Sequence, residues 1–336
     1  MASYRLGSRG EEVGRIQTAL KQKGFYLGPL DGDFGGGTES AVKAFQAAAG
    51  LDVDGDVGPI TWKTLFDEEI PEPELASDEL PRRCLTMTAT FETSRGPPEC
   101  FSGVSGDFDG QGISFGVLQW NFGQGSLQPL LQALLAKSGP VMSAVFQSRL
   151  PVLQAALAAD GDELMHFARS IQDPIRHNLN EPWGGMFKSL GRTPECQTMQ
   201  VEHARNVFDR AVALAKQYGL WSERAVALMF DILTQNGSIR DVTRAQILAD
   251  FEAIPADLAR EGQEVERMEI VAHRRAEACN PTWVEDVRSR KLCIARGSGL
   301  VHGVRYDVGM QFGVGLAPAW REAPARRAKN ETSAAS

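Results

Sequence analysis

Two carboxyl side chains, Glu92 and Asp109, lie in settings different enough to divide acid and base chemistry between them. Glu92 closes an apolar run that ends in Phe91, and Asp109 lies in a glycine-rich turn. A carboxyl group at an apolar helix end is desolvated and favours its protonated form, whereas one in a polar turn stays ionised. Cleavage of a glycosidic bond needs one carboxyl group to protonate the leaving oxygen and a second to activate water or attack the sugar. The pair therefore predicts glycoside hydrolysis.

The residues around this pair also have plainer interpretations. Composition alone favours a turn-forming role for Asp107 and Asp109, because Asp suits glycine-rich turns. Gln119, Trp120 and Asn121 are candidate substrate-binding residues, since an exposed Trp beside polar side chains is typical of a floor for sugar rings. The same residue types are equally ordinary in a strand and a core. Both interpretations stay open at the level of the sequence.

The elements expected to position these residues are mostly helices. The stretch 112–121 alternates and carries β-forming residues, which predicts a small hairpin or strand. On one apolar helix, Asp231 is best interpreted as the buried partner of an arginine such as Arg274 or Arg288, ahead of a substrate contact. We expect a mainly α unit with a small sheet over residues 84–315. Helical periodicity is clear in the segments 126–137, 193–218 and 222–235, with two charged amphipathic segments in 258–296.

A smaller helical unit precedes this one, in residues 1–66. Two turns of the form Asp-Gly-x-x-Gly, at Asp31–Gly35 and Asp54–Gly58, each precede a predicted helix. Asp and Gly suit turns and helix starts, which is the local explanation of each turn. Their recurrence indicates an internal duplication. The sequence therefore predicts a small three-helix bundle at the N-terminus.

Residues 67–83 are predicted to be an acidic linker. They hold seven acidic residues against Arg82 and Arg83, and their prolines disfavour regular hydrogen bonding. Like charges repel one another, so we expect this segment to be extended and solvated. The small and polar residues 316–336 are expected to form a disordered tail.

Composition excludes several classes of protein. A chain of 336 residues, 43% hydrophobic and 23% charged, is long enough for two soluble domains. A net charge of −8 argues against a nucleic-acid partner. No apolar run approaches the roughly 18 residues of a membrane span, so no membrane insertion is expected. The first residues lack a signal-peptide pattern, so we expect synthesis in the cytoplasm without export by the general secretory route.

The cysteines and histidines give no sign of a cofactor. The five cysteines include no Cys-x-x-Cys spacing, and the five histidines are scattered singly. Reduced, mostly buried thiols are favoured over a zinc site or a disulfide framework. We expect a monomer with no metal and no other cofactor.

The N-terminal motifs identify a family resemblance. Residues 4–66 resemble the three-helix peptidoglycan-binding domain, which implies a non-catalytic module that holds the protein on wall glycan or stem peptide. Asp31 and Phe34, in the first repeated turn, are the candidate ligand contacts. The resemblance rests on Leu6-Gly7-Ser8-Arg9-Gly10-Glu11-Glu12-Val13, Ile16-Gln17, Leu20, Gly24-Phe25, Asp31-Gly32-Asp33-Phe34-Gly35, Ala41-Val42, Phe45-Gln46 and Asp54-Gly55-x-x-Gly58.

The larger unit resembles the lysozyme-like superfamily, and within it the chitosanases of glycoside hydrolase family 46. Glu92 precedes the turn Asp109-Gly110-Gln111-Gly112-Ile113-Ser114 by seventeen residues, as the family's acid precedes its Asp-Gly-x-Gly turn. The segments Ala227–Gly237 and Arg274–Arg288 resemble later family motifs. The resemblance implies Glu92 as general acid, Asp109 as general base and Ser114 as the residue that orients the water. It implies inverting hydrolysis, with the carboxyl groups roughly 6.5–9.5 Å apart.

Two departures from the chitosanase pattern bear on the substrate. Phe115–Trp120 is similar to the Gly-x-x-Gln strand of muramidases and lytic transglycosylases, and Asn236, a candidate substrate-binding residue, replaces the family's His. We therefore predict a muramidase-like hydrolase of the β-1,4 glycan strand of bacterial peptidoglycan, targeted by its N-terminal unit. The alternatives are a chitosanase and a lytic transglycosylase that uses Glu92 alone. A catalytically silent wall-binding protein is disfavoured, because Glu92, Asp109 and Ser114 retain plausible chemistry.

The predicted cytoplasmic synthesis and the predicted wall substrate require a route across the membrane. A phage endolysin, released through holin pores, and a bacterial effector, delivered by a dedicated secretion machine, both fit these two predictions. The sequence does not choose between them.

Overall fold

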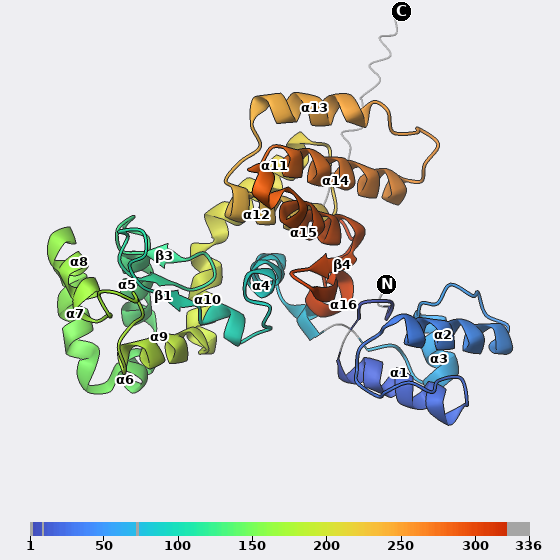
Figure 1. Ribbon diagram of the computed structural model, residues 1–336, viewed down its shortest axis with the longest axis horizontal. Coiled ribbons are helices and arrows are strands. Elements are labelled where there is room, and N and C mark those ends of the chain that lie inside the picture. The colour runs from blue at the N-terminus through green and yellow to red at the C-terminus, as the bar shows by residue number, and fades with distance from the viewer. Residues whose placement is uncertain (1–2, 9, 72–73, 321–336) are drawn as a thin grey trace, which may run out of the picture.

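The computed structural model describes residues 3–8, 10–71 and 74–320, and helices dominate it (Figure 1). Strands are confined to a three-stranded sheet and a hairpin. The prediction of a mainly α protein with small sheets is confirmed. Within the described residues, none of the helices combines the length and the apolar character that a membrane crossing requires.

The N-terminal bundle consists of α1 (Glu11–Gln22), α2 (Gly36–Ala49) and α3 (Pro59–Phe66), seen in blue in Figure 1. Apolar residues at helical spacing on α1 face those on α2 and α3 and exclude water from a small core of their own. Gly35 and Gly58, both with extended backbone, are the N-cap residues of α2 and α3. Gly50, in the left-handed region, ends α2. The core is built on residues that include Val13, Ile16, Leu20, Val42, Phe45 and Trp62.

The first repeated turn is organised by the side-chain amide of Gln17. Its Nε2 donates to Oδ1 of Asp31 at 2.8 Å and to the carbonyl of Asp33 at 2.9 Å. Its Oε1 accepts from the backbone N–H of Gly32 at 3.0 Å. The buried amide is thereby satisfied on both sides, as burial of a polar group requires.

The second repeated turn has the same arrangement around Gln46. Nε2 donates to Oδ1 of Asp54 at 2.7 Å and to the carbonyl of Asp56 at 2.9 Å. Oε1 accepts from the N–H of Gly55 at 2.9 Å. Each Asp-Gly turn is thus fixed by a Gln on the preceding helix, which gives the duplication in the sequence a common physical cause.

The larger unit begins with α4 (Leu80–Thr93), which lies at the centre of Figure 1. On one side of it is a lobe that carries the three-stranded antiparallel sheet, in the order β1-β2-β3. Residues 112–121 thus supply two short strands, β2 and β3. The elements of this lobe are η2 (Glu99–Phe101), β1 (Val104–Ser105), β2 (Ser114–Phe115), β3 (Trp120–Asn121), α5 (Leu127–Lys137), α6 (Gly139–Phe146), η3 (Gln147–Arg149), α7 (Leu150–Ala158), α8 (Gly161–Ser170) and α9 (Trp183–Gly191).

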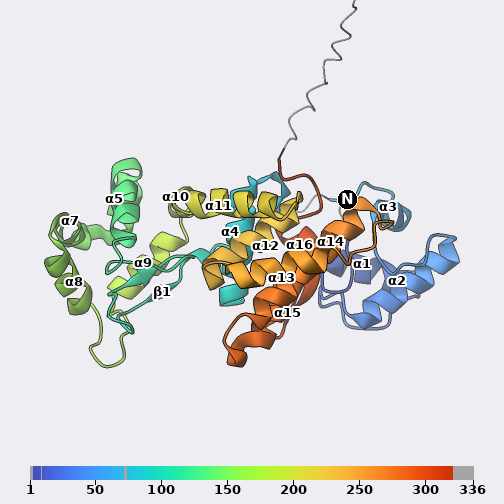
Figure 2. The same ribbon diagram turned by 90° about the horizontal axis from the view of Figure 1, so that it is seen from above.

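On the other side of α4 lies a helical lobe that ends in a β-hairpin, as Figures 1 and 2 show. The periodic stretch 193–218 forms two helices, α10 and α11, which meet at Ala204. Helix α10 (Pro194–His203) lies on the sheet side of α4 and packs against α5 and α9. The elements of the helical lobe are α11 (Arg205–Gln217), α12 (Glu223–Asn236), α13 (Asp241–Phe251), α14 (Arg260–Glu277), η4 (Pro281–Trp283), α15 (Val284–Arg296), β4 (Ser298–Val301), β5 (Val304–Asp307) and α16 (Val308–Phe312).

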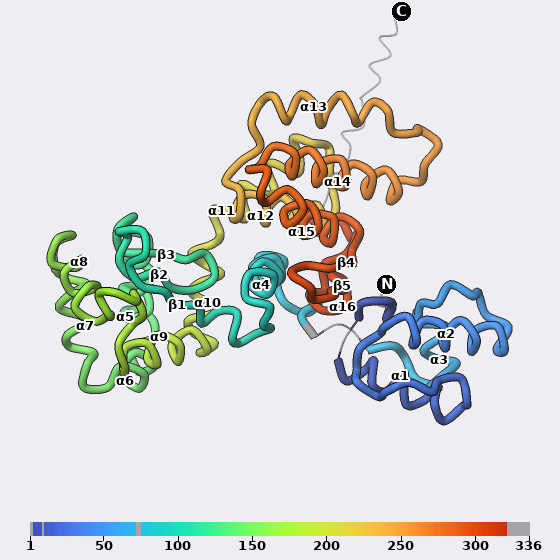
Figure 3. Tube along the Cα trace, viewed as in Figure 1, coloured from blue at the N-terminus to red at the C-terminus, as the bar shows by residue number. Residues whose placement is uncertain are grey.

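Helix α4 is buried along almost its whole length, from Pro81 to Phe91. It packs against α10, α12 and α16, so it is enclosed by parts of the chain that follow it by more than a hundred residues. The tube in Figure 3 shows this helix between the two lobes. A helix held this firmly fixes the position of the side chains at its C-terminal end, where Glu92 lies.

The two units contact each other through Asp307, whose side chain is fully buried. Its Oδ2 accepts from Oγ of Ser8 at 3.0 Å and from Nε of Arg5 at 3.1 Å. Its Oδ1 accepts from the N–H of Met310 at 2.9 Å and so caps α16. Met310 also packs against the core of the bundle. The N-terminal bundle is therefore docked on the larger unit.

The expected boundaries of the linker and the tail differ from the structure. Residues 74–77 form the 3-10 helix η1, and α4 already begins at Leu80. Arg83, assigned to the solvated linker, is buried and pairs with Glu223 at 2.7 Å. Residues 316–320, assigned to the tail, bond to the start of α12, where Ala317 accepts from Glu223. Residues 72–73 of the linker and 321–336 of the tail lie outside the described residues.

Candidate active site

Glu92 lies in the last turn of α4, and its side chain is 47% exposed, so the desolvated setting expected for this carboxyl group is wrong. Oε1 accepts a hydrogen bond from Nη1 of Arg290, on α15, at 2.5 Å. The guanidinium of Arg290 also lies over the ring of Phe91, at 5.6 Å from its centroid. Oε2 has no hydrogen-bond partner in the part of the chain that the structure describes. The carboxyl group is therefore held by one oxygen and open at the other.

Behind Glu92 lies a fully buried ionic cluster centred on Asp231 of α12. Arg290 Nη2 donates to Oδ1 of Asp231 at 2.7 Å, and Lys291 contacts Oδ2. Burial by itself raises the pKa of Asp231, but the charges of Arg290 and Lys291 and their hydrogen bonds outweigh it and hold that pKa well below its usual range. Asp231 is therefore a buried carboxylate between two cations, and Glu92 supplies the second negative charge of the cluster.

The partners expected for Asp231 were wrong. Arg274 instead pairs with Asp250 at 2.6 Å, and Arg288 pairs with Glu285. The buried ion pair itself is present, with Arg290 as the partner that reaches Glu92. Arg288 and Arg290 lie two residues apart on α15, so they point to different faces of the helix.

A cleft of about 570 Å³ opens beside Glu92. It runs between α4, the loops around the three-stranded sheet, and helices α11 and α12. Glu92 is the one carboxylate among the described lining residues, and Gln119 contributes to the lining from the loop before β3. The cleft is lined by Thr88, Ala89, Glu92, Thr93, Cys100, Gly103, Gly116, Val117, Leu118, Gln119, Val207, Leu233 and Thr234.

Gln119 is exposed, and its backbone has φ = 51°, in the left-handed region that non-glycine residues rarely adopt. Its Nε2 donates to the carbonyl of Gly116 at 2.8 Å, and its Oε1 accepts from Oγ of Ser105 at 3.2 Å. These bonds hold the amide at the edge of the cleft. A conformation of this kind is tolerated where the surroundings fix it, often at functional sites.

Asp109 is exposed in the glycine-rich loop and does not line the cleft. Its Oδ1 accepts from the N–H of Gln111 at 3.1 Å, the local bond typical of a turn-forming Asp. The neighbouring Asp107 accepts from the N–H of Gly112 at 2.9 Å and pairs with Arg169 at 3.1 Å. Burial raises the pKa of Asp107, but these bonds outweigh it, so this pKa lies below its usual range.

The remaining candidates near the sheet lie outside the described lining of the cleft. Ser114, half-buried on β2, pairs with Ser105 on β1 and Asn121 on β3. Trp120 is only 8% exposed and lies edge-on to His203, at a centroid distance of 6.4 Å. Asn121 is buried, and its Oδ1 accepts from Gln124 at 2.8 Å. Trp120 and Asn121 are thus placed as core and turn residues, and no exposed indole face is offered to a sugar.

Asn236, the last residue of α12, is half-buried and also lies outside the described lining of the cleft. Its Oδ1 is buried without a hydrogen-bond partner among the described residues. A buried acceptor without a partner is uncommon and costs free energy. Asn236 therefore stays a candidate for a ligand contact.

His302, at the tip of the β4–β5 hairpin, was not predicted as a site residue. Its Nδ1 is 3.0 Å from the carbonyl oxygen of Phe91, and its Nε2 is 2.8 Å from Oδ1 of Asp286. The imidazole thus joins the end of α4 to α15, directly beside Glu92. A contact across about two hundred residues leaves no periodic pattern that a single sequence could reveal.

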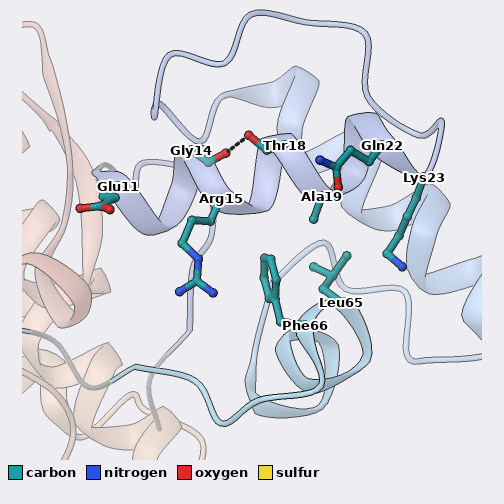
Figure 4. Close-up of a pocket in the computed structure, with 9 residues that line it drawn as sticks. All are labelled: Glu11, Gly14, Arg15, Thr18, Ala19, Gln22, Lys23, Leu65 and Phe66. Atoms are coloured by element: carbon teal, nitrogen blue, oxygen red, sulfur yellow. Dashed lines mark hydrogen bonds between the residues drawn. The ribbon is translucent and has the colours of Figure 1, made fainter.

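The N-terminal bundle has a groove of its own, of about 780 Å³, between α1 and α3 (Figure 4). Asp31 and Phe34 do not line it. Phe34 is 1% exposed in the bundle core, so its ring is not available to a ligand, and Asp31 holds the turn around Gln17. The groove is lined by Glu11, Gly14, Arg15, Thr18, Ala19, Gln22, Lys23, Leu65 and Phe66.

Comparison with known proteins defines the class of the N-terminal unit. Residues 9–65 match the family described as "Putative peptidoglycan binding domain". The chain therefore carries a peptidoglycan-binding domain at its N-terminus, which confirms the resemblance found in the motifs.

Two curated relatives share this N-terminal part. The N-acetylmuramoyl-L-alanine amidase CwlM of Mycobacterium tuberculosis is 40% identical over 76 residues, 19% of this chain and 19% of the relative. A spore cortex-lytic enzyme of Bacillus cereus is 48% identical over 59 residues, 18% of this chain and 23% of the relative. The chain thus spans about a fifth of the length of these relatives.

Among solved structures, a chitosanase complex is similar over 67% of this chain and 95% of its own. The sequence identity is 19% and the TM-score is 0.42.

Proposed function

We propose that the chain is a modular peptidoglycan hydrolase that cleaves the β-1,4 glycan strand, with Glu92 as the general acid. The observation that carries this proposal is the position of Glu92. It lines a cleft, one of its oxygens is bound by Arg290, and its other oxygen is open. A general acid must reach the leaving oxygen within hydrogen-bond distance, and the open oxygen of Glu92, on a carboxyl group that Arg290 holds in place, is the one that can do so.

The buried cluster behind Glu92 supports this role. Arg290 is bonded to Asp231, so it is fixed by a fully buried partner before it reaches Glu92. A side chain held by packing and by hydrogen bonds positions its neighbour more accurately than a mobile one. Arg290 and Asp231 are thus positioning residues, and Glu92 is the catalytic residue.

Once Glu92 has protonated the leaving oxygen, the attack on the sugar can take two forms. In inverting hydrolysis, Asp109 activates a water that Ser114 helps to orient. In lytic transglycosylation, Glu92 works alone and a hydroxyl of the substrate attacks. The second form is favoured by one observation, namely that Glu92 is the one described carboxylate that lines the cleft.

The substrate is proposed to be peptidoglycan ahead of chitosan. Chitosan is a polycation, and a cleft with a single carboxylate among its described lining residues offers it little electrostatic attraction. The linked peptidoglycan-binding domain raises the local concentration of wall substrate at the cleft. The protein would then act at the cell wall.

Mass spectrometry of the products from purified sacculi tests the function. Reducing MurNAc indicates a muramidase, reducing GlcNAc a glucosaminidase, and anhydroMurNAc a lytic transglycosylase. A parallel assay on soluble chitosan tests the alternative substrate. Release of free peptides alone, with glycan strands intact, would refute glycan cleavage.

A further inference from the structure

We propose that a pocket at the start of α12, here called the basic pocket, binds the phosphate group of a small phosphate monoester. The pocket has a volume of about 390 Å³. It is lined by the end of α11 with the turn that follows, by the first half of α14 and by Trp320. These helices lie together in the helical lobe (Figure 1). No described lining residue is common to this pocket and the cleft beside Glu92, so the inference goes beyond the proposed function.

Backbone hydrogen bonds bring Trp320 to the basic pocket. The N–H of Glu223 donates to the carbonyl of Ala317 at 2.8 Å, and the N–H of Ala319 donates to the carbonyl of Trp221 at 3.0 Å. The segment before Trp320 is therefore fixed against the start of α12. Two indole side chains, those of Trp221 and Trp320, thus contribute to one pocket although they are almost a hundred residues apart.

Glu264 fixes α14 against the same stretch of backbone. Its side chain is buried, and its Oε1 accepts from the N–H groups of Trp221 and Ser222, both at 2.9 Å. A carboxylate beside the first N–H groups of a helix is stabilised by their partial positive charge. The carboxylate of Glu264 is therefore engaged within the fold.

Positive charge dominates the lining of the basic pocket. Its cations are Lys216, Arg260 and Arg267, and Glu264 is the one carboxylate among the described lining residues, which leaves an excess of two positive charges. The guanidinium of Arg260 lies over the ring of Trp221, at 4.3 Å from its centroid. The chain as a whole has a net charge of −8, so this excess is local. Charges of one sign gathered in a concave site attract ions of the opposite sign.

The ammonium group of Lys216 is held by a ring instead of by a carboxylate. Its Nζ lies 4.8 Å from the centroid of the Trp320 ring. Lys216 forms no hydrogen bond and no ion pair with any residue that the structure describes. Contact with a ring face attracts a cation, but the donors that point away from the ring stay unused. These donors are therefore available to an anion in the pocket.

The guanidinium group of Arg267 is only partly satisfied by the chain. Its Nη1 donates to the carbonyl of Gly219 at 3.3 Å, which is long for a hydrogen bond, and it lies over the ring of Phe251 at 5.5 Å. Its Nε is buried without an acceptor among the described residues, where Nη2 also makes no hydrogen bond. Buried donors without partners are uncommon. A guanidinium with unused donors is suited to bind the oxygens of a phosphate.

The size and charge of the basic pocket favour a phosphate monoester. Sites for small molecules typically occupy about 300–1,000 Å³, so a pocket of about 390 Å³ suits a small ligand. A phosphate monoester carries about two negative charges at neutral pH and three terminal oxygens that accept hydrogen bonds. Its charge matches the excess of the lining, and its oxygens accept from Lys216 and Arg267 together. A carboxylate or a phosphodiester carries a single negative charge and matches the lining less well.

Titration calorimetry of the full chain tests the site, with glycerol 3-phosphate as the probe at constant ionic strength. We expect saturable binding of one molecule per chain. Lys216→Gln and Arg267→Gln should each weaken this binding at least tenfold, because each removes a charge and hydrogen-bond donors. Lys188→Gln removes an exposed lysine of α9, in the other lobe, and should leave the affinity unchanged.

Circular dichroism checks that all three variants are folded. Lys216 is exposed, so its substitution should leave the fold intact. Arg267→Gln also loses the contact with Phe251. If that variant is unstable, Lys216→Gln still decides the outcome.

Related ligands distinguish the possible sources of the phosphate. Glycerophosphoglycerol, a phosphodiester with one negative charge, should bind at least tenfold more weakly than glycerol 3-phosphate, and glycerol should not bind. Vesicles of phosphatidylglycerol should retain no more protein in co-sedimentation than vesicles of phosphatidylcholine. This pattern would assign the basic pocket to a small monoester and not to a lipid surface.

Several results would overturn the inference. They are the absence of saturable binding, an equal loss of affinity in Lys188→Gln, and equal affinity for the phosphodiester. Binding to phosphatidylglycerol vesicles without binding of glycerol 3-phosphate would also overturn it, because the basic residues would then contact a lipid surface. None of these measurements depends on glycan cleavage, and Glu92→Gln should bind the probe with unchanged affinity. Failure of the proposed hydrolase activity would therefore leave the titration result intact.

Discussion

A single guanidinium group, that of Arg290, links the solvent-facing carboxyl group of the cleft to the buried one behind it. Its Nη1 bonds to Glu92, and its Nε and Nη2 bond to Asp231. Asp231 is shared between Arg290 and Lys291, so Glu92 supplies the second negative charge beside Arg290 and is oriented by it. We therefore expect the two carboxyl groups to have separable roles. Removal of Glu92 should reduce catalysis, and removal of Asp231 should reduce stability.

The first expectation concerns Glu92→Gln, which preserves size and one hydrogen-bond acceptor but cannot donate the catalytic proton. Cleavage of soluble glycan fragments should fall by about 10²–10⁴-fold, the usual contribution of a general acid. Co-sedimentation with sacculi, which depends on the N-terminal bundle, should not change. Activity within a few-fold of the unmodified chain would remove Glu92 from the acid role.

The second expectation separates the two forms of the chemistry. If Asp109 activates water, Asp109→Asn should lose most activity, Ser114→Ala should lose less, and the fresh product should have inverted anomeric configuration. Proton NMR of the new reducing end measures this directly. A 1,6-anhydro product, together with an active Asp109→Asn variant, would leave Glu92 as the only catalytic carboxyl group and Asp109 as a turn residue.

At the scale of elements, α4, α12 and α15 are joined by the cluster around Asp231. The folded-state pKa of Asp231 lies below its unfolded value of about 3.9. Its stabilising contribution is therefore fully present above about pH 4 and is lost as the pH falls from there toward the folded value. The cluster should make the protein sensitive to acid.

Asp231→Asn tests this contribution. The substitution leaves Arg290 and Lys291 buried without their anion, so the free energy of unfolding at neutral pH should fall by about 3–5 kcal/mol. The loss should shrink between pH 4 and pH 2, which denaturant unfolding at several pH values measures. Asp250→Asn, which breaks the more exposed pair with Arg274, is the control and should change stability much less. Equal effects of the two substitutions would contradict a special role for the buried cluster.

The sequence was informative about elements whose pattern is local. The helices α1, α2, α3, α5 and α12 follow from apolar periodicity, and the repeated Asp-Gly turns mark the starts of two of them. Long-range pairing was not predictable in this way. The choice of Arg290 over Arg288, and the position of His302 beside Phe91, depend on how α15 and the hairpin pack against α4. The sequence pattern also could not predict that the side chain of Trp120, on β3, would be buried.

At the scale of the whole molecule, targeting and cleavage should be separable. A chain lacking residues 1–66 should still cut soluble glycan fragments, because Glu92 and its cluster lie wholly in the larger unit. It should act poorly on intact sacculi, since it loses the peptidoglycan-binding domain. Digestion of sacculi at the full-length rate would contradict the targeting role. A lower melting temperature is expected as well, because Asp307 loses Arg5 and Ser8.

The buried carboxylate of Asp307 has a consequence for the pattern of cuts in the wall. A wall-binding unit on a free tether would let the cleft sample any bond within reach, and fragment lengths would be random. Here Asp307 bonds to Ser8 and Arg5 and to α16 at the same time, so direct contacts tie the N-terminal bundle to the unit that carries the cleft. Under the proposed function, an anchored molecule would reach glycan bonds at a set distance from its point of attachment. The spacing of the attachment points along the wall, more than diffusion, would then set the lengths of the fragments.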